Sequence, residues 1–218
     1  MAAKTYIQLV NAVLKRLRET PVGAVSTNIL SSLVGEFVNE AKSQVEDSHD
    51  WKALEKTITL TTEADTKVYS LTGAGEDPKF LLAYNDTVNS TMTQRNYSQI
   101  QRMYLNSTDT TGPVYQFAAK GIDVNGDVEL EVYPIPSSVE SLVFRVVSTT
   151  VDLDLDTDTM LIKDRPVVQL ALAMAIAERG EEGSISSTEQ FQLADRFLSD
   201  AIAKDANSEQ GTTDWSAQ

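Results

Sequence analysis

Four aspartates at alternate positions form the pattern in this sequence that most resembles a metal-binding loop. They are Asp152, Asp154, Asp156 and Asp158. An EF-hand calcium loop starting at Asp152 would need glycine at its sixth position and glutamate at its twelfth. Thr157 and Lys163 occupy those positions, so we do not predict a calcium loop.

His49 is the only histidine, and the chain contains no cysteine. Disulfides and thiolate metal sites are therefore excluded, and any Ser-His-Asp arrangement would have to use His49. This histidine lies between Asp47 and Asp50 near the end of a predicted helix, which favours a capping or surface role. The sequence also lacks the Walker A, G-x-S-x-G and H-E-x-x-H motifs. We predict no catalytic residue, no metal and no cofactor, and hence not an enzyme.

The net charge of −14 argues against a protein whose main function is to bind nucleic acid tightly. Two stretches are acidic and free of Lys and Arg: one contains Glu129 and Glu131, and the other contains the four alternating aspartates. These acids can form a solvated surface that keeps the protein soluble, or a wall that repels DNA. The longest apolar run, 167–177, is about half the roughly 20 residues that span a bilayer, so we expect no membrane partner.

Helical periodicity predicts two helices before residue 52. The first covers 5–18 and opens with a capping-box pair, Thr5 and Gln8. The second covers 26–51 as one long amphipathic helix. Its apolar stripe contains Ile29, Leu33, Phe37, Ala41 and Val45, with Leu30, Val34 and Val38 one position over.

Two further helices are predicted near the carboxyl end. One begins around Asp164 and ends at Gly180, and it is apolar or Ala on nearly every side, so we expect other helices to surround it. The last opens at Ser186 or Ser187 and runs to about Ala206.

Between these helix pairs the apolar period changes to two, which indicates β-strands. The predicted strands cover 57–61, 68–71, 80–84, 114–118, 127–133 and 139–147. Asn125 and Gly126 suit a two-residue type I′ hairpin turn. The polar stretches 85–96 and 106–112 are predicted loops, separated by a short helix over 97–105.

The predicted fold class is α+β, a discontinuous helical bundle with an inserted antiparallel β-sandwich-like domain. The bundle comprises residues 1–54 and 160–206, and the β-rich insertion comprises 55–150. Residues 151–159 form an acidic linker, and 207–218 form a flexible carboxyl-terminal tail without periodicity.

The order of these parts resembles the head-to-tail adaptors of short-tailed bacteriophages, also called tail tubular protein A or gatekeeper-type connectors. The likeness is carried by an opening YIQLVN at 6–11, by LVGEFVNEA at 33–41 with the helix running to Asp50-Trp51, by YPIP at 133–136 followed by LVFR at 142–145, and by the Ala-rich closing helix pair. It covers most of residues 5–205, and its motifs are patterns of apolar and turn residues.

This resemblance implies a structural virion protein that forms a ring of about twelve copies. The ring would sit at the head–tail junction, between the portal protein and the tail nozzle protein, and would often support tail fibres. Assembly would take place in the host cytoplasm, and genomic DNA would pass through the ring during ejection. Under this interpretation we expect an acidic DNA channel lined by some of Glu129, Glu131, Asp152, Asp154, Asp156 and Asp158.

The carboxyl-terminal residues Thr213, Asp214 and Trp215 could dock on the portal by ordering during assembly, or could remain a plain disordered end. Two other functions stay open. One is a different virion ring, such as a tail-completion or terminator protein. The other is a carbohydrate-binding module that would use Tyr84, Tyr97, Tyr104 and Tyr115.

Overall fold

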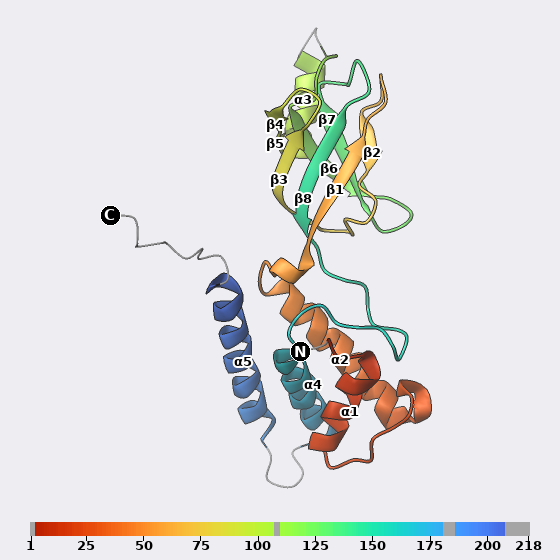
Figure 1. Cartoon of the computed structure of the whole chain (residues 1–218), viewed down its shortest axis with the longest axis vertical. Helices are drawn as coiled ribbons and strands as arrows, with labels where there is room; N and C mark the ends of the chain where they lie inside the picture. Colours follow the sequence, from red (N-terminus) through yellow and green to blue (C-terminus); the bar gives the residue numbers. More distant parts are fainter. Residues whose placement is uncertain (1–2, 107–109, 181–185, 208–218) are drawn as a thin grey trace, which may run out of the picture. The chain divides into compact units, whose positions relative to one another are not determined.

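The computed structural model describes residues 3–106, 110–180 and 186–207. The chain divides into two compact units, which we call the helical unit (Met1–Ala53 and Thr150–Gln218) and the β unit (Leu54–Thr149). Figure 1 shows the helices of the first unit and the strands of the second. The predicted α+β class, with a discontinuous bundle and an inserted β-sandwich, is confirmed.

In the described residues of the helical unit there are four α-helices: α1 (Tyr6–Arg16), α2 (Ile29–Asp47), α4 (Asp164–Arg179) and α5 (Ser187–Asn207). The helices α1, α2 and α4 contact one another, and α5 packs along α4 (Figure 1). Their shared core is aliphatic and includes Leu9, Val13, Val34, Val38, Val45, Val167 and Ala171. Helices from the two ends of the chain therefore close on one interior, and small alanines on α4 allow the close approach.

The helix α2 is shorter than predicted. It begins at Ile29 and ends at Asp47, and a separate 3₁₀ turn, η1, covers Val25–Thr27. The break arises at Asn28, whose backbone is extended and whose side chain accepts a hydrogen bond from the Ser31 N–H at 2.8 Å. The Ser31 hydroxyl oxygen in turn accepts one from the Asn28 N–H, at 3.1 Å. This reciprocal cap is what starts the helix at residue 29.

Two four-stranded sheets form the β unit. The first has the order β1 (Glu55–Thr61), β8 (Ser141–Val147), β3 (Lys79–Asn85) and β4 (Ser90–Thr91). The second has the order β2 (Val68–Ser70), β7 (Val128–Tyr133), β6 (Gln116–Ile122) and β5 (Thr93–Gln94). All pairs are antiparallel except β5 with β6.

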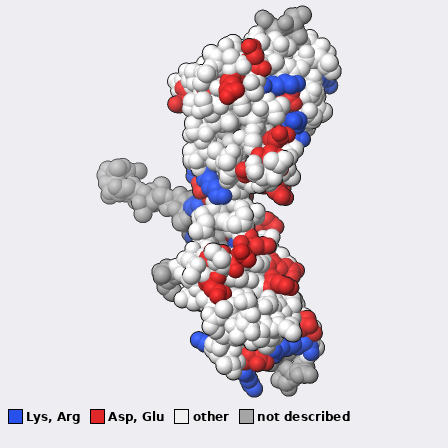
Figure 2. All heavy atoms as spheres, turned by 90° about the vertical axis from the view of Figure 1, so that its right-hand side faces the viewer, with Lys and Arg blue, Asp and Glu red and all other residues white. Residues whose placement is uncertain are grey.

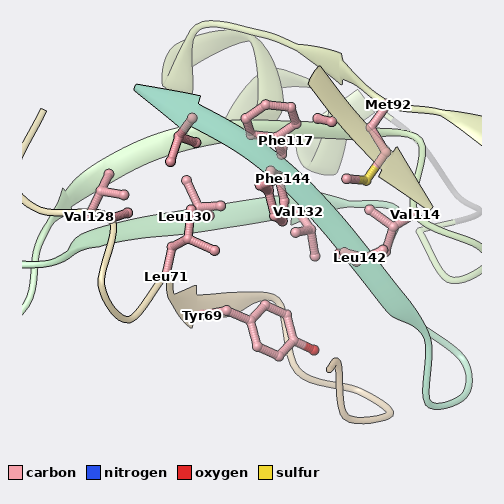
Figure 3. Close-up of a cluster of buried hydrophobic side chains, with 13 residues drawn as sticks. Tyr69, Leu71, Met92, Val114, Phe117, Val128, Leu130, Val132, Leu142 and Phe144 are labelled. Carbon is pink, nitrogen blue, oxygen red and sulfur yellow. The ribbon is translucent and has the colours of Figure 1, made fainter. Parts of the chain in front are cut away.

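Side chains from both sheets meet in one core, which makes the β unit a sandwich (Figure 3). Phe117 of β6 and Phe144 of β8 lie edge to face with ring centroids 5.2 Å apart. Met92 joins this core from the short connection between β4 and β5. The predicted loop 85–96 thus contributes a strand to each sheet.

The turn between β6 and β7 differs from the predicted type I′ hairpin. Gly126 has a positive φ of 84°, but Asn125 does not, and a type I′ turn needs both. The Gly126 N–H donates to the Asp123 carbonyl at 3.2 Å, and the Asp123 N–H donates to the Asp127 carbonyl at 2.8 Å. This is a three-residue loop with glycine at the left-handed position, selected because the Asp123 carboxylate accepts the Asn125 and Asp127 N–H groups.

A short helix, α3 (Tyr97–Asn106), was predicted correctly, and it packs against β6 and β7. The return segment, which we define as residues 150–163, joins β8 to α4 without forming a helix or a named strand. It is held to the helical unit: the Tyr6 N–H donates to the Asp158 carbonyl at 2.8 Å, and Thr5 forms an isolated bridge with Thr159. The Ala-rich helix α4 that follows buries most of its apolar residues, as predicted.

Candidate assembly surface

One surface of the helical unit is acidic, and we define this acidic face as Glu36, Glu40, Asp152 and Asp154. All four side chains are exposed, the first two on α2 and the others on the return segment. Glu36, Glu40 and Asp152 line one open hollow together with Asn39, Ser43 and Gln44. Figure 2 shows Asp and Glu side chains gathered over part of this unit. The structure therefore places one of the predicted channel acids, Asp152, in a hollow with two glutamates that the prediction did not include.

The aspartates Asp156 and Asp158 are half-buried and carry structural hydrogen bonds. The Val25 N–H donates to the Asp156 carboxylate at 2.9 Å, which ties the return segment to η1. The Asp158 carboxylate accepts from the Asp154 and Leu155 N–H groups at 2.9 and 2.8 Å and so closes a turn. These two side chains shape the segment, whereas Asp152 and Asp154 present their charge to solvent.

The pKa of Tyr6 responds to the negative charges of the acidic face. Burial raises the pKa of its phenol, and the negative charges of Asp152, Glu36 and Asp154 raise it further. The tyrosine lies on the buried side of α1. The charges of α2 and of the return segment therefore act on one point of the unit.

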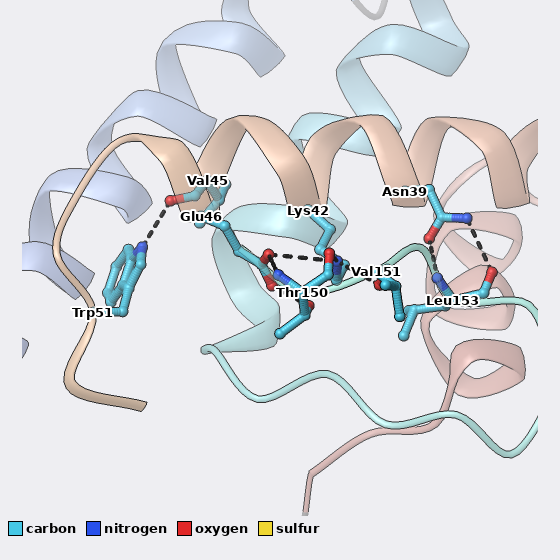
Figure 4. A network of polar contacts seen from close by, with 8 residues as sticks. All are labelled: Asn39, Lys42, Val45, Glu46, Trp51, Thr150, Val151 and Leu153. Atoms are coloured by element: carbon cyan, nitrogen blue, oxygen red, sulfur yellow. Dashed lines mark hydrogen bonds and ion pairs between the residues drawn. The ribbon is translucent and has the colours of Figure 1, made fainter. Parts of the chain in front are cut away.

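Lys42 is the single cation of α2, and its side chain contacts the return segment at Thr150 and Val151 (Figure 4). Its side chain is 1% exposed, and that of its partner Glu46 is 0% exposed. Lys42 Nζ donates to the carbonyls of Thr150 and Val151 at 2.8 and 3.0 Å and lies 3.4 Å from Glu46 Oε2. The Glu46 carboxylate accepts from the Thr150 N–H and hydroxyl at 2.8 and 2.9 Å. Lys42 therefore adds no exposed positive charge to the acidic face.

The sequence interpretation missed this network, because it left Lys42 off the apolar stripe of the helix and placed Ile29 on it. The structure reverses the two: Lys42 is buried and Ile29 is 90% exposed. A signal was present in the four-residue spacing of Lys42 and Glu46, which lets the two side chains pair on one helix face. Nothing in the spacing distinguishes a buried pair from the common solvated one.

The predicted channel acids of the β unit lie in different settings. Glu129 is half-buried and receives a hydrogen bond from Lys120 Nζ at 3.1 Å. Glu131 is 1% exposed, lies 3.2 Å from Lys67 Nζ, and accepts from Gln101 Nε2 of α3 at 2.6 Å. Because its carboxylate is enclosed, Glu131 anchors α3 to the sheet and presents no charge to solvent in this unit.

The tyrosines of the carbohydrate hypothesis do not share one setting either. Tyr104 packs edge to face against Tyr133, with centroids 5.1 Å apart, and its hydroxyl donates to the Val132 carbonyl. Burial is the main cause that raises the pKa of Tyr104, followed by the charge of Glu131. Tyr97 and Tyr115 are exposed and Tyr84 is half-buried. Tyr104 is thus part of the packing between α3 and β7 and offers no open ring for a sugar.

Large apolar side chains are exposed on both units. On the helical unit these are Ile29, Val151, Leu155 and Leu161. On the β unit they include Leu81, Leu82, Leu105, Ile122, Val124 and Val139. An open hollow at the start of α2 contains Ile29 and Leu33 beside Glu36.

His49 follows the carboxyl-terminal end of α2. His49 Nε2 lies 3.4 Å from the Asp205 carboxylate, and its ring packs edge to face on Trp51. Within residues 3–106, 110–180 and 186–207, no three His, Asp or Glu side chains are grouped so that they could hold a metal. None of the helices in that part of the chain has the length and apolarity needed to cross a bilayer. The predicted tail residues Thr213, Asp214 and Trp215 lie outside the described residues.

Comparison with protein families finds a match to the family described as SU10 adaptor protein, and this match spans residues 4–217. A comparison with the curated proteins finds no match. The family match covers both units, and it confirms the resemblance to phage head-to-tail adaptors that the sequence motifs indicated. The chain belongs to the SU10 adaptor protein family, and it is therefore a structural adaptor protein of a bacteriophage virion.

Proposed function

We propose that this adaptor assembles into a ring of about twelve copies at the head–tail junction. In this proposal the ring forms in the host cytoplasm, docks beneath the portal protein and carries the tail nozzle protein, with tail fibres attached at its side. Genomic DNA passes through the centre of the ring during ejection. The proposal rests on the family match over residues 4–217 and on the exposed apolar residues of both units, which suit contacts with several partners.

The acidic face is the observation that carries the DNA-passage part of this proposal. At −14 per chain, twelve copies carry on the order of −170 charges, which repel a duplex of the same sign. Screening limits this repulsion to about 8 Å at physiological salt, so only carboxylates that face the channel matter. We assign the lining to Asp152 and Asp154, whose carboxylates are exposed, with Asp156, Asp158 and Glu129 contributing less. Glu131 is left out because it is buried.

The ring and its place in the virion are tested by electron microscopy of purified particles and by mass photometry of the protein with and without portal protein. We expect a ring of this chain between the portal and the nozzle. A chain that stays monomeric with portal protein and is absent from the head–tail junction contradicts the proposal. Density for this chain at the end of a long tail tube would instead support a terminator ring.

The acidic lining is tested with the double variant Asp152→Asn/Asp154→Asn. Because neutral side chains do not repel phosphate, we expect the assembled variant ring to bind DNA more tightly at low salt and to slow ejection. The matched control is Asp195→Asn/Asp200→Asn, which removes two exposed acids from α5. Equal behaviour of the two double variants would show that Asp152 and Asp154 do not face the DNA.

A further inference from the structure

The β unit is joined to the helical unit by two chain connections, and both are bonded to the end of α2. Before the first connection, Trp51 Nε1 donates to the Val45 carbonyl at 2.7 Å. After the second, Thr150 donates its N–H and hydroxyl to Glu46. Val45 and Glu46 are neighbours in the last turn of the helix. One helix end therefore holds both points where the chain leaves for the β unit and returns from it.

The first residues of the second connection, 150–153, are held by side chains of α2 (Figure 4). Asn39, Lys42 and Glu46 follow one face of the helix, at spacings of three and four residues. Lys42 and Glu46 bind Thr150 and Val151, as described above. Asn39 accepts from the Leu153 N–H and donates to the Leu153 carbonyl, both at 3.0 Å. The backbone of residues 150–153 is thus bound like a peptide ligand.

A buried ion pair is an uncommon way to hold a segment if stability alone is needed. Well-packed apolar residues of the same volume often stabilise as well or better, and buried ion pairs are best attested where they fix a register or a switch. Here the ion pair binds backbone groups at one register only. Its directional contacts select where the return segment begins, which apolar packing would not do.

The same segment carries a charge that opposes this binding. Asp152 lies between the bound residues Val151 and Leu153 and shares a hollow with Glu36 and Glu40 of α2. Like charges so close repel one another, and because the hollow is open to solvent, the repulsion weakens as salt increases. The repulsion at Asp152 therefore weakens the binding of the return segment by Asn39, Lys42 and Glu46, and it does so most at low salt.

We propose that Asn39, Lys42 and Glu46 form a releasable catch that holds residues 150–153 of the return segment on α2. With the catch open, the segment is free as far as Asp156, whose carbonyl accepts from the Ile7 N–H. Salt, or a cationic partner surface near Asp152, closes the catch.

Hydrogen exchange of residues 148–155 in the full chain tests the catch, since the Thr150 and Leu153 amides are its donors. We expect Asn39→Ala to speed this exchange about threefold to tenfold, the effect of losing a hydrogen-bonded pair. Asn11→Ala is the matched control, because the Asn11 side chain likewise donates to the Val22 carbonyl and accepts from the Val22 N–H. It should leave residues 148–155 unchanged. Equal exchange in the wild type and Asn39→Ala would overturn the catch.

A substitution that should strengthen the catch distinguishes a releasable catch from a general loss of stability. We expect Asp152→Asn to slow the exchange of residues 148–155 about twofold at 20 mM salt, and to have no effect at 0.5 M, where the repulsion is screened. In the wild type, exchange should slow as salt rises, while the Asn11 contact responds little. Unchanged or faster exchange in Asp152→Asn at low salt contradicts the opposing charge, and with it a releasable catch.

Discussion

At the scale of single residues, this adaptor uses carboxylates for structure wherever they are enclosed. Glu46 binds the return segment, Glu131 anchors α3, and the Glu140 carboxylate accepts from the Val114 N–H at 3.1 Å. Each of these would be costly without its partners, because a buried unpaired charge loses its hydration. The carboxylates left for contact with DNA or other chains are therefore fewer than the net charge suggests.

The pKa of the Asp123 carboxyl is expected to lie below the ordinary value of an aspartate. Hydrogen bonds from the Ser70 hydroxyl and the Asp127 and Asn125 N–H groups hold the pKa of its carboxyl near 2, below the ordinary 3.8. The folded state binds the proton less readily than the unfolded state, so this carboxylate stabilises the fold above about pH 4. That stability is lost as pH falls through about 2.

Carbon-13 NMR of the Asp123 carboxyl is the measurement, and we expect its midpoint near pH 2. Ser70→Ala should raise the midpoint, because it removes the largest cause of the shift. Asp86, an exposed aspartate of the same unit, gives an internal comparison within the same spectra. A midpoint for Asp123 at or above 3.8 would show that the turn is not organised by its carboxylate.

At the scale of elements, the contact between α1 and α2 depends on a glycine. A Cβ built on Gly35 would lie 2.5 Å from Tyr6 Oη and 2.8 Å from Val25 Cγ1. We expect Gly35→Ala to lower the free energy of unfolding by roughly 1–2 kcal/mol, because overpacking costs about 1–3 and the better helix propensity of alanine returns up to about 1. Urea unfolding measures the change.

Two variants make this prediction specific. Gly23→Ala adds the same methyl group where nothing lies within 4 Å, and it should change stability little. Tyr6→Phe, made together with Gly35→Ala, removes the nearest clashing atom and should recover part of the loss. Without such recovery, the cost of Gly35→Ala would have to arise from a contact other than Tyr6.

At the scale of the whole molecule, the inserted β unit should be separable. Its ends are adjacent, because Glu55 of β1 pairs with Val147 of β8. It also has its own core, built from both sheets. We expect residues 54–149 alone to give a dispersed NMR spectrum and a cooperative melt, and the rest of the chain, closed by a short Gly/Ser linker, to keep its helical circular dichroism. An unfolded β fragment would show that its core depends on the helical unit.

The types of the elements, their order and the family could all be predicted from the amino-acid sequence. The apolar period of α1, α4 and α5, the period of two from Glu55 to Val147, and the motifs near 6–11, 33–41 and 133–145 are local or nearly local signals. They predicted the bundle, the sandwich and the phage adaptor correctly. The start of α2 and the turn at Asn125 were wrong in detail, because the side-chain hydrogen bonds of Asn28 and Asp123 outweighed the general pattern.

Which charges are buried depends on how distant segments of the chain pack together. Lys42 and Glu131 have the sequence context of surface residues, and their burial depends on Thr150, Lys67 and other partners 30 to 109 residues away. The same limit applied to the candidate channel acids, of which Asp152 and Asp154 are exposed and Glu131 is not. Side-chain periodicity reports which face of an element is apolar, but the partner that satisfies a buried charge arrives only when distant segments pack together.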